Sequence, residues 1–274
     1  MIVVKQVTVF THGEEQFWES SLDQIIGKYE RELLRNATKK TYMISESEKL
    51  YKTLFNSISH ELRIPLAAIM GSSETLLEQQ LPEPIQKELY SEINIASIRL
   101  NRLVENLLNM SRLESGRITP HLDWCDALDL ANSVSESLKY ELESYTFKTD
   151  IPNDLPLIYI DFGLMEQVLH NLILNATQHS PHGSVIELKI QIAGETLIIK
   201  VIDHGSGFPE EELSSVFDKF YRGKNAKAGG TGLGLSIVKG FVEAQYGNVS
   251  ALNGENGGAV FTLKIPAKQM DLQQ

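Results

Sequence analysis

The sequence predicts an α+β fold in which a helical hairpin precedes an α/β sandwich. Its 274 residues, 42% of them apolar, are enough for two ordinary domains. Between about residues 45 and 116, apolar side chains recur every three or four positions, as they do on one face of a helix. From about residue 117 onward, short apolar runs separated by glycines indicate strands, so we place a domain boundary there.

The first 44 residues form too few elements for a domain of their own. The valine-rich stretch 2–10 predicts a strand, and the capping-box spacing of Thr11 and Glu14 predicts a helix that runs to about Arg35. One strand and one helix cannot bury a core, so either they pack on the rest of the chain or they end a truncated domain. We expect the second arrangement, with residues 1–44 ending a sensory domain and adding a linker helix.

The first helix of the hairpin carries a histidine outside its apolar stripe. Leu50, Leu54, Ile58 and Leu62 predict the buried face, and His60 points about 200° away from it. Glu61 is suited to orient the imidazole, which would leave one ring nitrogen free as a nucleophile. Pro65 lacks an N–H and predicts a bend one turn after the histidine. A packed core histidine is the less favoured interpretation.

A second helix follows the break at Leu81-Pro82-Glu83-Pro84. Its apolar residues alternate spacings of four and three, which is typical of a coiled-coil seam; they are Leu89, Ile93, Ala96, Leu100, Leu103, Leu107 and Met110. We therefore predict that residues 45–116 form a homodimer, a four-helix bundle of two hairpins. The alternative is that the hairpin packs only on the second domain.

The predicted second domain, residues 117–274, starts with a short strand. We then expect a helix from Cys125-Asp126 to about Leu142, a strand 157–160, a helix from Phe162 to about His179, a hairpin of 185–190 with 196–202, a helix at about 235–245, and a pair of strands at 248–252 and 260–265. Helices on one face of a mixed sheet make an α/β sandwich.

Two groups of polar residues in this domain have the chemistry of a nucleotide site. Asn171 and Asn175 are four residues apart on one helix, so both amides face the same way and could help to bind a Mg²⁺ ion that also holds phosphates. Asp203 follows an apolar strand and precedes Gly205 and Gly207, so its carboxylate could accept from the exocyclic amine of adenine. Surface asparagines and an ordinary glycine turn are the structural alternatives.

Two further segments complete the set. The aromatic and basic run 216–222 is suited to a lid hinge, with Arg222 reaching phosphates; a plain surface helix is the alternative. Gly229-Gly230-Thr231-Gly232-Leu233-Gly234 leads into a helix, where free backbone N–H groups and the helix dipole attract phosphate. The spacing matches neither a P-loop nor a dinucleotide fingerprint.

Composition excludes several other classes. The net charge of −11 argues against nucleic-acid binding. Cys125 is the only cysteine, so neither an intrachain disulfide nor a cysteine metal site can form. No apolar run is long enough to cross a membrane, so we expect a cytoplasmic chain or the cytoplasmic portion of an inner-membrane sensor.

The histidine segment together with the four segments of the second domain closely resembles the catalytic core of sensor histidine kinases, over about residues 45–266. The first strand and helix are similar to the end of a GAF domain. Finer similarity, which includes the stretch Phe162 to Ser180, points to the Kdp-type, potassium-responsive branch of the family. The resemblance implies a Bergerat-type sandwich, ATP with Mg²⁺, a homodimer, and transfer of phosphate to the receiver domain of a response regulator.

The resemblance also assigns roles residue by residue. His60 and Glu61 match the catalytic pair, and Asn171 and Asn175 match the metal-associated asparagines. The nucleotide positions are matched by Asn171, Asn175, Asp203, Gly205, Gly207, Arg222, Gly230, Thr231, Gly232, Leu233 and Gly234. Two departures stand out. Gln178-His179 replaces a pair that commonly carries a lysine, and Ile64 replaces a polar residue that would position water. We therefore expect a kinase with weak regulator phosphatase activity.

Two other functions would use the same fold. A gyrase- or Hsp90-like ATPase has a glutamate four residues before the metal asparagine, where this chain has Asn171, and an amide cannot take a proton from water. A nucleotide-binding pseudo-kinase that serves as a dimerisation scaffold is the second alternative, and the complete set of nucleotide segments disfavours it.

Overall fold

A computed structural model describes residues 21–22, 26–29, 32, 34–35, 58–223, 232–255, 257–266 and 268–270. The chain divides into two compact units, Met1–Ser57 and Ile58–Gln274. In the first unit, every described residue is helical, in agreement with the helix predicted up to Arg35. The strand predicted at 2–10 lies outside the described residues.

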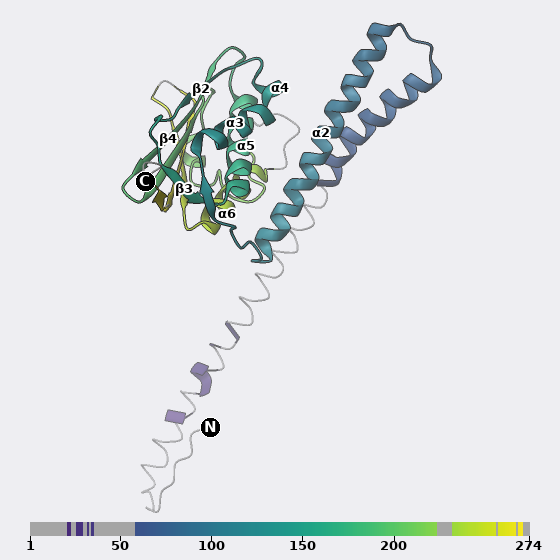
Figure 1. The fold of residues 1–274 in the computed structure, drawn as a ribbon. Coiled ribbons are helices and arrows are strands. Elements are labelled where there is room, and N and C mark those ends of the chain that lie inside the picture. The colour runs from purple at the N-terminus through teal and green to yellow at the C-terminus, as the bar shows by residue number, and fades with distance from the viewer. Residues whose placement is uncertain are drawn as a thin grey trace, which may run out of the picture. The chain divides into compact units, whose positions relative to one another are not determined.

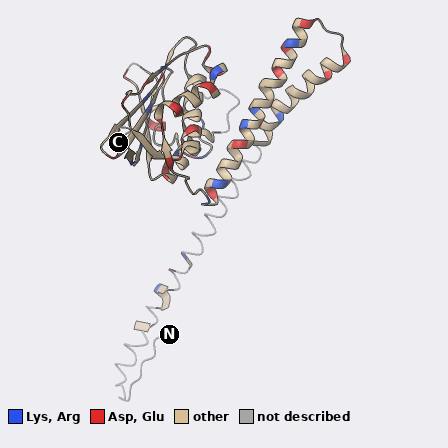
Figure 2. Ribbon diagram, viewed as in Figure 1, with Lys and Arg blue, Asp and Glu red and all other residues tan. Residues whose placement is uncertain are grey.

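The hairpin consists of a first helix, described over residues 58–78, and the 32-residue helix α2, Glu83–Glu114 (Figure 1). Pro82 stands directly before α2, where a missing N–H costs nothing. The predicted seam of α2 is confirmed, because its seven residues are all buried or half-buried, with Ala96, Leu103 and Met110 buried most deeply. Residues of both charge signs are distributed along the two helices (Figure 2).

Within one chain, the face predicted for the first helix is only partly buried, and its residues Leu50 and Leu54 lie outside the described residues. The residues that this helix buries are Glu61, Pro65 and Ser72, whereas Leu66 is 48% exposed and Ile58 and Leu62 are only half-buried. Periodicity identifies an apolar face but does not say which neighbour covers it. Within one chain, the first helix turns a partly polar face toward α2.

Among residues 58–114, two polar contacts connect the helices of the hairpin. Arg99 Nη2 lies 3.4 Å from Glu61 Oε2, and Ser72 Oγ donates a hydrogen bond of 2.8 Å to Glu92 Oε2. Glu61 and Ser72 are both buried, so each needs the partner that α2 supplies. These contacts fix how the two helices pair.

The α/β region, residues 123–270, contains two sheets. The larger has the strand order β2-β4-β5-β7-β6; its strands are β2 (Thr146–Asp150), β4 (Val185–Ala193), β5 (Thr196–Ile202), β7 (Ala259–Pro266) and β6 (Asn248–Asn253). Only β2 and β4 pair in parallel, so the sheet is mixed, as predicted. The smaller sheet has the order β1-β3-β8; its strands are β1 (Asp123–Cys125), β3 (Leu157–Ile160) and β8 (Gln269–Met270).

Helices cover one face of the larger sheet; they are α3 (Ala127–Ser137), α4 (Lys139–Leu142), α5 (Phe162–His179) and α6 (Gly234–Ala244). A short 3-10 helix, η1 (Glu210–Glu212), follows β5. The predicted single helix up to Leu142 is divided into α3 and α4. Ser137 Oγ donates to the carbonyl of Val134 at the end of α3, a bond that competes with the helical backbone.

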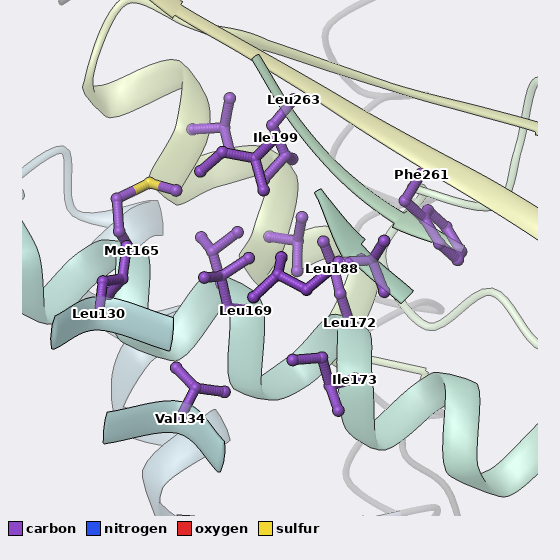
Figure 3. Close-up of a cluster of buried hydrophobic side chains, with 14 of the residues drawn as sticks. Leu130, Val134, Met165, Leu169, Leu172, Ile173, Leu188, Ile199, Phe261 and Leu263 are labelled. Carbon is purple, nitrogen blue, oxygen red and sulfur yellow. The ribbon is translucent and has the colours of Figure 1, made fainter. Parts of the chain in front are cut away.

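The core lies between α5 and the sheet. Figure 3 shows side chains of α3 and α5 meeting those of the central strands; among them are Leu130, Val134, Met165, Leu169, Leu172, Ile173, Leu188, Ile199, Phe261 and Leu263. Each of these side chains has at most 1% of its surface exposed to solvent. Asp161 accepts from the Leu164 N–H and so caps the first turn of α5, which fixes where this central helix begins.

The C-terminal half of α2 also contacts the α/β region. Arg102 Nη2 pairs with Glu141 Oε1 at 2.8 Å, and Asn109 Nδ2 donates a bond of 2.9 Å to Gln167 Oε1. None of the helices in the described ranges combines the length and the apolar character that crossing a bilayer requires.

Candidate active site

His60 is exposed on the first helix of the hairpin, as the sequence predicted. The helix is continuous through Pro65, and Ile64 follows His60 by one turn, on the same side of the helix. Ile64 is 41% exposed, so an apolar side chain stands beside the imidazole. The imidazole is therefore open to a reaction partner at the surface.

The side chain of Glu61, the residue after His60, faces α2. This side chain is 6% exposed and pairs with Arg99 across the hairpin. The sequence singled out Glu61 but not Arg99, because the two residues are 38 positions apart and no local spacing connects them. The carboxylate lies beside the histidine in sequence and faces α2 in the structure.

Asn171 and Asn175 both lie on α5 and are half-buried between residues of its buried face. Asn171 Oδ1 lies 4.0 Å from the position that a Cβ on Gly234 would occupy, so this amide faces the first residue of α6. A Cβ there would be in ordinary van der Waals contact with the amide. Asn171 and Gly234, which belong to two of the four predicted nucleotide segments, therefore lie close together.

Asp203 lies directly after β5 and is 3% exposed. Its Oδ1 accepts hydrogen bonds from the N–H groups of Gly205, at 2.9 Å, and Ala259, at 3.1 Å. Burial raises the pKa of Asp203 above its usual value, while these bonds and the nearby His179 and His204 act in the opposite direction. A buried carboxylate held by the backbone is suited to recognise a donor such as an exocyclic amine.

Gly205 and Gly207 occur where the chain passes close to other backbone. A Cβ on Gly205 would stand 2.4 Å from the carbonyl oxygen of His179 at the end of α5. Gly207 has a φ of +66°, and a Cβ there would meet Asn253 Oδ1 at 2.6 Å. Both glycines are therefore required by packing as well as by any ligand.

The glycine segment before α6 is described only from Gly232 onward, so Gly230 and Thr231 lie outside the described residues. Gly232 has a φ of +67°, Leu233 is fully buried, and Gly234 begins α6. The N–H of Phe220 donates a hydrogen bond of 3.0 Å to the carbonyl of Gly232. This bond holds the aromatic run 216–222 against the start of α6.

Arg222 is exposed at the end of that run. The preceding residue, Tyr221, donates a hydrogen bond from its hydroxyl to Glu212 Oε2. Burial and this carboxylate raise the pKa of Tyr221 to about 12. Phe220 has a φ of +65°, an uncommon conformation for a bulky residue. The run is thus fixed by backbone and side-chain bonds at the position from which Arg222 projects.

Sequence reasoning missed two residues that hold the Asp203 loop. Asn253 ends β6 and bonds to Phe208, and Ala259 begins β7 and bonds to Asp203. The glycine-rich turn between them was predicted only as a connection between strands. Its unusual number of glycines was the available indication that another backbone segment passes close to it.

Comparisons with known proteins agree with this geometry. Residues 51–116 match the His Kinase A (phospho-acceptor) domain, and residues 161–269 match the histidine kinase-, DNA gyrase B- and HSP90-like ATPase family. Asp203 and the two asparagines fall within the second match, and His60 falls within the first.

Individual relatives cover most of the chain. The sensor protein KdpD of Clostridium acetobutylicum is 36% identical over 250 residues, which are 89% of this chain and 28% of that protein. KdpD of Escherichia coli is 34% identical over 240 residues, 86% of this chain and 27% of that protein. The chain thus spans less than a third of the length of either relative.

A solved structure extends the comparison to the fold. The histidine kinase AdeS of Acinetobacter baumannii superposes with a TM-score of 0.57 at 25% identity, over 76% of this chain and 97% of that one. The similarity therefore includes both the hairpin and the α/β region.

Proposed function

Because this chain belongs to the sensor histidine kinases, we propose that it uses ATP to phosphorylate His60 and then passes the phosphoryl group to an aspartate of a response regulator. The observation that carries the proposal is that the same chain has an exposed histidine on the hairpin and a buried carboxylate, Asp203, in the ATPase-like region. Since both relatives above are KdpD proteins, we also propose that the chain serves the Kdp-type branch.

ATP is accommodated by the residues around Asp203. The carboxylate would accept from the adenine amine, and the N-terminus of α6 and Arg222 would face the phosphates. Among the described residues, no three His, Cys, Asp or Glu side chains gather as a metal site. Mg²⁺ bound by phosphates and waters needs few protein ligands, so the half-buried amides of Asn171 and Asn175 fit this ion. Bound there, Mg²⁺ would offset the charge of the phosphates.

In the transfer step, a ring nitrogen of His60 forms a bond to the γ-phosphorus. The bond from that phosphorus to the bridging oxygen breaks, and its electron pair leaves with ADP. The proton on the other ring nitrogen passes to a base, the role that we propose for Glu61. Because Glu61 pairs with Arg99, its carboxylate must turn from Arg99 toward His60 to accept that proton.

The hairpin also supports a homodimer. Leu66, Met70 and Leu77 form an apolar row on the first helix, with exposed fractions of 48%, 55% and 86%. Their spacings of four and seven place them on one side, roughly opposite the Glu61–Pro65–Ser72 face that meets α2. A second copy of the hairpin would cover this row and complete a four-helix bundle. His60 lies outside the row and would remain accessible.

Labelling with γ-labelled ATP and Mg²⁺ tests the proposal. We expect acid-labile label on the protein, its loss in His60→Gln, and its loss in Asn175→Ala with the fold intact. Asn248→Ala, an exposed asparagine at the start of β6, is the control that should label normally. Label that survives His60→Gln would contradict the assignment, and free phosphate without labelled protein would instead support a gyrase- or Hsp90-type hydrolase.

A further inference from the structure

Asn253 lies outside every segment to which the proposed chemistry assigns a role. We infer that it is a positioning residue that fixes the nucleotide loop, residues 203–208, and thereby sets the preference for adenine. The inference rests on the proposed function, because it concerns how the same site selects its nucleotide. Asn253 itself acts through Phe208 and needs no contact with ATP.

The amide of Asn253 bonds to both backbone groups of one loop residue. Its Nδ2 donates a hydrogen bond of 2.7 Å to the carbonyl of Phe208, and its Oδ1 accepts a hydrogen bond of 2.8 Å from the N–H of Phe208. The two residues are 45 positions apart, so the bonds tie separate segments together. A residue bound on both sides by one planar amide has little freedom to shift or rotate.

The turn that follows Asn253 is pressed against the same loop. A Cβ on Gly258 would stand 1.9 Å from the carbonyl oxygen of Asp203. A Cβ on Gly207 would stand 2.9 Å from the carbonyl oxygen of Gly258, besides its approach to Asn253. The backbone of Gly258 therefore packs directly on the loop, beside the Asn253 side chain.

The other end of the turn fixes the carboxylate. The carbonyl of Ala259 accepts a hydrogen bond of 3.0 Å from the N–H of Asp203, and the N–H of Ala259 donates a hydrogen bond of 3.1 Å to Asp203 Oδ1. Asn253 and Ala259 are opposite each other in the β6–β7 register. One strand pair thus holds the loop at both ends, at Asp203 through backbone and at Phe208 through the Asn253 side chain.

The contact at Asp203 is made by the backbone of Ala259 and does not involve the Asn253 side chain, whereas the contact at Phe208 depends on that one amide. Removing that amide would free Phe208 and the glycines before it, so that Asp203 would meet adenine in a less defined geometry. Recognition of the adenine amine should suffer more than binding of the phosphates, which other segments contact. The readout is therefore discrimination between bases rather than stability.

Calorimetric titration with ADP and GDP tests this inference in the full chain. We expect Asn253→Ala to weaken ADP binding about tenfold, the effect of losing one to two net hydrogen bonds. GDP binding should change little, so the ratio of the two affinities should fall. Asn248→Ala, at the opposite end of β6, is the matched control that should leave both affinities unchanged.

The outcomes separate the two proposals. If the unmodified chain binds no ADP, the proposed function fails and the inference fails with it. If the unmodified chain binds ADP and Asn253→Ala keeps both the affinity and the ADP preference, only the inference is overturned. Amide hydrogen exchange needs no variant: the Phe208 N–H should be protected in the free protein, and exchange at an unprotected rate would also overturn it.

Discussion

Ile64 determines what stands beside the exposed imidazole of His60. It follows His60 by one turn and is 41% exposed, so it can meet a regulator bound at His60. An isoleucine has no group to orient a water molecule.

We predict that Ile64→Thr speeds the loss of label from the phosphorylated regulator several-fold while His60 labelling persists. Ala67→Thr, an exposed position on the same helix, is the control. An unchanged rate in Ile64→Thr would contradict the prediction.

Asp203 should make the chain less stable than an uncharged variant at neutral pH. Burial raises the pKa of Asp203 in the folded protein above its value in the unfolded chain, which is about 3.9. The protonated carboxyl group therefore stabilises the fold fully at pH values below the unfolded pKa, and this stabilisation is lost as pH rises through the folded pKa. An asparagine in its place could not bind adenine in the same way, but its amide oxygen could accept the same two N–H bonds.

We therefore predict that Asp203→Asn raises the unfolding midpoint at pH 7 by a few degrees, while nucleotide binding is lost. The difference in midpoint between the two proteins should shrink as pH falls toward the ordinary carboxyl pKa. Thermal unfolding across this pH range, followed by circular dichroism, measures it. A difference in midpoint that stays constant with pH would mean that the charge of Asp203 is not the cause.

Short spacings in the sequence identified the candidate residues that lie near one another along a single element. Asn171 with Asn175, and Asp203 with its glycines, were identifiable because a helix or a strand end places neighbours predictably. Arg99 and Asn253 were not, because their partners lie 38 and 45 positions away and depend on how elements pair. Glu61 shows the same limit, since its position beside His60 did not reveal that it faces Arg99.

The described glycines of the β6–β7 turn differ from the glycine of the β4–β5 turn in how closely other backbone approaches them. Gly258 has a φ of +80°, and a Cβ there would stand 1.9 Å from backbone, whereas Gly194, with a φ of +60°, has nothing within 4 Å of the same position. We predict that Gly194→Ala costs only the left-handed strain of about 1–2 kcal/mol. Gly258→Ala should cost clearly more, since the turn must separate from the Asp203 loop.

Chemical denaturation of the two glycine variants compares these costs directly. Equal losses of unfolding free energy would show that backbone conformation alone, and not the close approach, requires glycine at 258. In Gly258→Ala, the weakening of nucleotide binding should accompany the loss of stability. In Gly194→Ala, which lies between β4 and β5, binding should be unchanged.

Elements with a strong local pattern were predicted almost to the residue. The bounds of β3, β5 and α5 agree with expectation because alternation, caps and turns mark them. The strands β2 and β8 were missed. Four of the five residues of β2 are exposed, so no alternation marks it, and β8 has only two residues. Such strands exist because a neighbouring strand offers free backbone groups.

At the scale of the whole molecule, the apolar row Leu66, Met70 and Leu77 predicts association. We expect the chain to sediment as a dimer and the double variant Leu66→Glu, Met70→Glu to sediment as a monomer, since two carboxylates would be buried without partners. Ser91→Glu, which adds a charge at an exposed position of α2, is the control and should stay dimeric. A dimeric double variant would contradict the prediction.

The two polar contacts inside the hairpin have a mechanical consequence. Sliding the first helix along α2 by one turn would move Glu61 and Ser72 about 5.4 Å from Arg99 and Glu92, and would leave buried polar groups without partners. Rotation or spreading of the helices does not require such a displacement along their length. A lengthwise force on the first helix would therefore meet more resistance than a torque, because sliding breaks the Glu61–Arg99 and Ser72–Glu92 contacts together.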